Sequence, residues 1–222
     1  MNIIKRPFRY SNDGVVFWLI GINILVYIFM RLLGNSIRVT LNIDMEKIPV
    51  SLSNALAMIP ITVLHGWIWS FITYMFMHGS VTHILFNMLG LFIFGVPVER
   101  QMGSREFLLY YLLTGALAGV FSFGVYLFTS PYAPLVGASG AIFAVELAYA
   151  VFFPDSIIYI WGILPLRAPV MVLGFTALEL FFSITGRNSS VAHLTHLAGF
   201  GIGWLYFMIR IGVNPWRRLT GR

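Results

Sequence analysis

Six apolar stretches, each close to the length that an α-helix needs to cross a lipid bilayer, constrain this chain more than any other feature. A spanning helix requires about 20 mostly apolar residues. We therefore predict an all-α integral membrane protein, folded as a single domain over residues 1–222. The approximate bounds of the predicted spans are Val15 to Leu33, Val81 to Val98, Phe107 to Phe128, Ser139 to Phe153, Ala168 to Ile184 and His196 to Val213.

Composition excludes several other classes of protein. Hydrophobic residues make up 59% of the 222 residues and charged residues only 10%, too few to cover a water-soluble globule of this size. The chain has no cysteine, which excludes disulfides, thiolate metal sites and a cysteine nucleophile.

The net charge of +6 is explained by membrane topology, because most of the cations flank apolar stretches. We expect the lipid bilayer as a partner and no nucleic acid. Residues 1–14 form a short basic cytoplasmic terminus before an anchor that is not cleaved, and residues 214–222 form a second one. This charge pattern predicts a multi-pass integral membrane protein. The ends of the spans that carry His78, Ser139 and His196 then face the non-cytoplasmic side.

Residues 34–80 form a large loop after the first span, and its second half is unusually apolar. Residues 59–77, "IPITVLHGWIWSFITYMFM", could pass for a seventh span, but Pro60 and the pair His65-Gly66 interrupt the run. We predict a partly embedded loop that packs against the bundle, since irregular backbone at membrane depth must be covered by protein. A seventh span is the alternative.

Polar side chains inside apolar spans are costly and indicate function. In "HGSVTHILFN", His83 and Asn87 are four residues apart and share one helix face. They form either a hydrogen-bonded pair between helices or part of a site. The histidine spacing matches no metal-ligand pattern, so we expect no metal.

Small residues predict a close contact between the fourth and sixth spans. In "VAHLTHLAGFGIGW", His196, Gly199 and Gly203 lie on one helix face, which lets another helix approach closely. The fourth span offers a matching face of small residues: Ser139, Gly140, Ala144 and Ala148.

The stretch "VGASGAIFA" places Ser139 where the fourth span begins. One interpretation is an N-cap, the commonest role of serine at this position. The other is a nucleophile whose proton passes to His196, with His83 and Asn87 as donors to the oxyanion.

Together, "HGSVTHILFN", "GASGAIFA" and "AHLTHLAGFGIGW" resemble the rhomboid family of intramembrane serine proteases, over about Trp67 to Trp204. The resemblance implies the minimal six-span prokaryotic form, a Ser139-His196 dyad and membrane-anchored protein substrates, without a cofactor. It also implies an oxyanion site and its supporting residues, which comprise His83, Asn87, Gly137, His78 at a hydrated entrance, Phe143 stacked on the base, and His193. A catalytically silent membrane chaperone is the alternative, followed by a transporter; the oligomeric state is left open.

Three positions are less clearly assigned. Glu146 follows Ser139 by almost two helical turns, about 10 Å deeper, so we interpret it as a structural carboxyl. Glu179 is interpreted as a polar contact between helices. His193 either lines the pocket with the oxyanion donors or ends its span at the interface. The family often has Trp-Arg where this chain has Trp69-Ser70, which leaves the partner of Glu99 open.

Overall fold

The computed structural model describes residues 8–43, 46–160, 162–185 and 190–221. Among these, five helical segments are long and apolar enough to cross a membrane. Three are the single helices α1 (Val15–Leu33), α7 (Ser104–Thr129) and α9 (Ala168–Thr185). The other two include a π-helical part. In one, η3 (Leu91–Gly95) joins α5 (Val81–Gly90) to α6 (Val96–Met102). In the other, η4 (Phe207–Ile211) continues α10 (Ser190–Tyr206). With the shorter α8 (Ser139–Phe152), they confirm the predicted bundle of six apolar helices.

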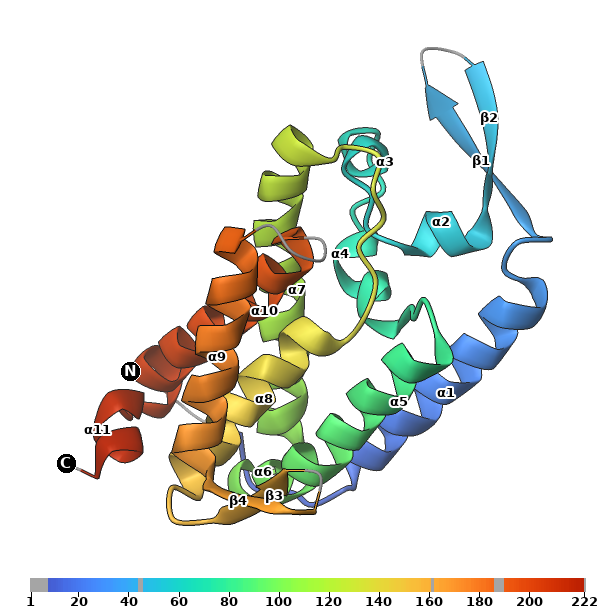
Figure 1. Cartoon of the computed structure of the whole chain (residues 1–222). Helices are drawn as coiled ribbons and strands as arrows, with labels where there is room; N and C mark the ends of the chain where they lie inside the picture. Colours follow the sequence, from blue (N-terminus) through green and yellow to red (C-terminus); the bar gives the residue numbers. More distant parts are fainter. Residues whose placement is uncertain (1–7, 44–45, 161, 186–189, 222) are drawn as a thin grey trace, which may run out of the picture.

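Helix α8 lies in the middle of the bundle, and α7, α9 and α10 pack around it (Figure 1). Most of its residues are buried, which explains why it is apolar on all sides. Its 14 residues extend over about 21 Å, less than the roughly 30 Å of a bilayer core. Helix α8 is therefore too short to reach both surfaces.

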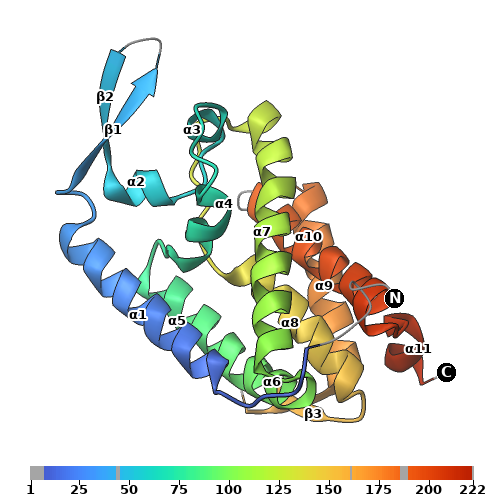
Figure 2. The same ribbon diagram turned by 180° about the vertical axis from the view of Figure 1, so that it is seen from behind.

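The first loop is folded but is not a continuous helix. It contains the short helices α2 (Leu52–Leu56), α3 (Pro60–Leu64) and α4 (Ser70–Thr73), followed by η2 (Tyr74–Phe76). Figure 2 shows α3 and α4 beside α7, and the Tyr74 hydroxyl donates to the Gly115 carbonyl of α7 at 2.7 Å. The loop packs against the bundle as predicted, and the alternative of a seventh span is wrong because Gly66, at φ 93°, breaks the helix.

Two antiparallel hairpins, neither of them predicted from the sequence, add to the helical fold. The first, β1 (Arg38–Ile43) with β2 (Glu46–Ser51), projects from one end of the bundle. The second, β3 (Ile157–Ile160) with β4 (Leu164–Arg167), lies at the opposite end beside α6 (Figure 1). A last short helix, α11 (Pro215–Thr220), follows η4.

Glu99, whose partner the sequence left open, caps the first helix. Its two carboxylate oxygens accept the backbone N–H groups of Val15 at 2.7 Å and Val16 at 2.9 Å. The Ser104 hydroxyl donates to the same carboxylate. The carboxylate thus satisfies N–H groups that have no acceptor within α1 and lies at the positive end of its dipole.

Candidate active site

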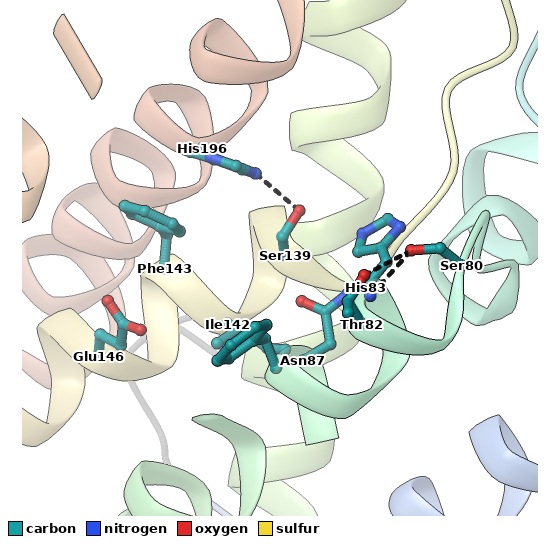
Figure 3. Close-up of a pocket in the computed structure, with 10 residues that line it drawn as sticks. Ser80, Thr82, His83, Asn87, Ser139, Ile142, Phe143, Glu146 and His196 are labelled. Carbon is teal, nitrogen blue, oxygen red and sulfur yellow. Dashed lines mark hydrogen bonds between the residues drawn. The ribbon is translucent and has the colours of Figure 1, made fainter. Parts of the chain in front are cut away.

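Ser139 is the first residue of α8, and its side chain points to α10. The Ser139 Oγ lies 2.7 Å from the Nε2 of His196, as Figure 3 shows. Ala138 occupies the N-cap position without a side-chain cap. The interpretation of Ser139 as an N-cap is therefore wrong, and its hydroxyl is paired with the histidine.

Glycines bring α8 and α10 close enough for this contact. A Cβ atom added to Gly199 would lie 1.9 Å from the carbonyl oxygen of Gly140, so the two backbones touch. One turn further, a Cβ on Gly203 would lie 3.0 Å from that of Ala144. Any larger side chain at Gly199 would push the helices apart and separate Ser139 from His196.

Phe143 fixes the plane of the His196 ring. The two rings are stacked with centroids 4.6 Å apart and planes inclined by 8°. Phe143 is one turn after Ser139 on α8, so the helix that carries the hydroxyl also supports the imidazole.

A pocket of about 450 Å³ opens in front of Ser139. His83 and Asn87 of α5 face it from the side opposite His196 (Figure 3). The Nδ2 of Asn87 is buried, and no residue in the described part of the chain accepts its hydrogens. An unpaired buried donor is costly, so this amide is available to a ligand oxygen in the pocket.

Gly137 makes room for His83. A Cβ added to Gly137 would lie 2.6 Å from the Nε2 of His83, and its φ of 118° is unfavourable for other residues. The next residues begin α8, whose first N–H groups have no acceptor within the helix. Backbone and side-chain donors therefore converge on one side of Ser139, which is an arrangement that can stabilise an oxyanion.

His78 is not at a hydrated entrance, in contrast to the prediction. It is buried behind His83, with ring centroids 5.0 Å apart, and is absent from the residues that line the pocket. Burial lowers the pKa of His78 to about 4, and the neighbouring His83 adds to this effect. His78 therefore stays neutral at physiological pH and supports the His83 ring from behind.

His193 is not among the residues that line the pocket with the oxyanion donors. It lies in the first turn of α10, which begins at Ser190, and so at the end of its span, which is the second of the two predicted alternatives. Its Nδ1 lies 2.5 Å from the Oε2 of Glu179, on α9. The same oxygen lies 3.2 Å from the Nδ1 of His196. Glu179 is thus a contact between helices, as predicted: it is paired with His193 and also faces the candidate base. Glu146 lines the pocket further along α8 (Figure 3).

The Glu179 carboxylate, His193 and His196 also have the donor types of a metal site, and their ligand atoms lie within 4.8 Å of one another. A metal on the Nδ1 of His196 would leave the remaining ring proton on Nε2, where it would prevent the histidine from accepting a proton from Ser139. A metal here is incompatible with a base at His196.

Comparison with known proteins gives the class to which this fold and site belong. Residues 65–212, about two thirds of the chain, match the model of the Rhomboid domain. The chain belongs to the rhomboid family.

Named relatives include bacterial proteases. The chain is 34% identical over 146 residues to the Bacillus subtilis protein named "Putative rhomboid protease YdcA", covering 64% of this chain and 67% of that protein. It is 32% identical to the rhomboid protease GlpG of Haemophilus influenzae, covering 64% and 69%. For the mouse rhomboid-related protein 2, at 34% identity, the match covers 59% of this chain and only 44% of the relative. The chain thus spans less than half of some relatives.

Proposed function

We propose that this protein is an intramembrane serine endopeptidase that cleaves membrane-anchored proteins in or near their transmembrane segments, with Ser139 as nucleophile and His196 as general base. The contact of 2.7 Å between Ser139 Oγ and His196 Nε2 carries the proposal. The names of several relatives as proteases support it.

In the proposed reaction, Ser139 attacks the scissile carbonyl carbon as its proton passes to Nε2 of His196. The carbonyl oxygen becomes an oxyanion and accepts hydrogen bonds from Asn87, His83 and the Ser139 amide. The C–N bond then breaks, His196 returns the proton to the leaving amine, and Ser139 is left as an ester.

Hydrolysis of the ester completes the cycle. His196 takes a proton from water, the hydroxide oxygen attacks the ester carbon, and the proton returns to Ser139 as the acid leaves. Water must therefore reach Ser139 inside the bundle. The hydroxyls of Ser80 and Thr82 at the rim of the pocket, with His83 and Asn87 deeper, provide a polar path.

The active site faces the non-cytoplasmic side in this proposal. Helix α8, of which Ser139 is the first residue, runs from the middle of the bundle toward the end formed by α6 and the β3–β4 hairpin, so Ser139 lies at the end of α8 that points away from that hairpin (Figure 1). The end of the bundle with the hairpin carries a group of arginines, which the positive-inside rule assigns to the cytoplasm. They are Arg100, Arg105 and Arg167.

The test is cleavage of a tagged single-span substrate in liposomes by the purified protein, beside Ser139→Ala and His196→Ala variants whose melting temperatures match the parent. We expect cleavage by the parent only, and labelling of Ser139 by a fluorophosphonate probe. Equal cleavage by all three proteins would contradict the dyad. A parent that neither cleaves several substrates nor reacts with the probe would indicate the membrane chaperone instead.

A further inference from the structure

The side of His196 that faces away from Ser139 contacts a carboxylate on a third helix. Glu179 Oε2 lies 3.2 Å from His196 Nδ1, and the two side chains are only 17% and 19% exposed. The two atoms are within hydrogen-bonding distance but are not aligned for a full hydrogen bond. Contacts of catalytic groups are often misaligned without substrate and tighten in the reacting complex.

This carboxylate lies where it can select the tautomer of His196. A neutral imidazole carries one proton, and Nε2 can accept the Ser139 proton only if the ring proton is on Nδ1. A carboxylate beside Nδ1 favours that tautomer. It also stabilises the imidazolium that forms when Nε2 takes up the second proton.

His193 holds this carboxylate in place. Its Nδ1 lies 2.5 Å from the same Oε2 atom, one helical turn before His196 on α10. The ring of Phe182 on α9 packs against the ring of His193, with centroids 5.6 Å apart. Glu179 is thus fixed by one histidine and faces the other, so both of its contacts reach α10 from α9.

We propose that Glu179 is a positioning residue: from α9, it holds His196 in the Nδ1–H tautomer and the orientation needed to accept a proton from Ser139. This inference rests on the proposed function, and it assigns to α9 a part in a reaction otherwise carried by α5, α8 and α10. Glu146 cannot take this part, because Glu179, not Glu146, contacts Nδ1.

Kinetics of Glu179→Gln in proteoliposomes tests the proposal. We expect kcat to fall by about 10² or more while KM changes less than about twofold, because the neutral amide neither selects the tautomer nor stabilises the imidazolium. Glu179→Asp should recover part of kcat. The matched control is Thr176→Val, which removes a hydroxyl that donates within α9, to Val172 at 2.8 Å, and should leave kcat unchanged.

The tautomer itself provides a readout that does not depend on cleavage. In ¹⁵N spectra of histidine-labelled protein, we expect His196 to carry its proton on Nδ1 in the parent and to shift toward the Nε2–H form in Glu179→Gln. If Glu179→Gln fails to fold, the spectrum of the parent and the kinetics of Glu179→Asp still decide the question.

The outcomes separate this inference from the proposed function. A parent that cleaves, with Glu179→Gln equally fast, would overturn the role of Glu179 and leave the Ser139-His196 dyad standing. A parent that does not cleave would overturn the proposed function. In that case, an Nε2–H tautomer of His196 in the parent would overturn the role of Glu179 as well. An Nδ1–H tautomer of His196 that is present in the parent and lost in Glu179→Gln would support that role.

Discussion

Helix α10 contacts two of its neighbours, α8 and α9, in opposite ways. Against α8, backbone meets backbone at Gly199 and Gly140. Against α9, the polar contact runs through the long side chain of Glu179. The buried residues of α9 lie in its first turns, from Ala168 to Val172, whereas the half that carries Glu179 is less covered by protein. The dyad therefore lies across a rigid contact, and the orienting carboxylate lies across a more adaptable one.

The largest effect is expected where the rigid contact is broken. Gly199→Ala places a methyl group 1.9 Å from the Gly140 carbonyl oxygen, so α8 and α10 must separate. We expect cleavage to fall by about 10³ or more, because a displacement of about 1 Å in a catalytic group can already cost about 10²-fold. We also expect the protein to be destabilised by about 1–3 kcal/mol, the usual range for overpacking. Cleavage rate and melting temperature are the measurements.

Gly201→Ala is the control on the same helix, since a Cβ there meets no atom within 4 Å. It should cleave like the parent and be slightly more stable, because alanine favours a helix by about 1 kcal/mol over glycine. Full activity in Gly199→Ala would show that the dyad does not depend on the contact between the two backbones.

A smaller effect is expected from zinc, which would tighten the adaptable contact. Zn²⁺ bound by Glu179, His193 and His196 would hold α9 on α10 and keep a proton on Nε2. We expect Zn²⁺ to inhibit cleavage, EDTA to restore it, and His193→Ala to need about tenfold more zinc or higher. Equal sensitivity of His193→Ala and the parent would place the inhibitory zinc elsewhere.

The smallest effect concerns a hydrogen bond that anchors α10 to α7 beside the base. The Ser122 hydroxyl donates to the Ala118 carbonyl at 2.8 Å and lies 2.6 Å from the Thr195 hydroxyl of α10. Ser122→Ala should lower stability by about 1 kcal/mol. We expect cleavage close to that of the parent, since the glycine contact still fixes His196. A large loss of kcat without a change in melting temperature would show that α7, too, orients the base.

The sequence predicted those features that depend on a single helix or on composition. The six apolar stretches are visible because a bilayer demands length and hydropathy. Ser139 and His196 are conspicuous because polar side chains are rare in such stretches. The face of small residues on α10 could be predicted because Gly199 and Gly203 repeat at helical spacing.

Features that depend on the rotation and depth of one helix relative to another were not predictable. Whether Glu179 faces His196 depends on the rotation of α9 about its own axis relative to α10. No local sequence pattern determines that rotation. His78 was expected at an entrance because of the family resemblance, but it lies in the link between η2 and α5, buried behind His83. The β1–β2 hairpin was not predictable from apolar length, because its strands of six residues each form no long apolar run.

The cap at Glu99 bears on how the chain is assembled during its synthesis. Two N–H groups at the start of α1 find their acceptor 83 and 84 residues later in the chain. When α1 enters the membrane it must therefore leave this end in contact with water or lipid headgroups, because the carboxylate that satisfies it has not yet been made. Once α6 is in place, its Glu99 carboxylate accepts both N–H groups and ties the start of α1 to α6.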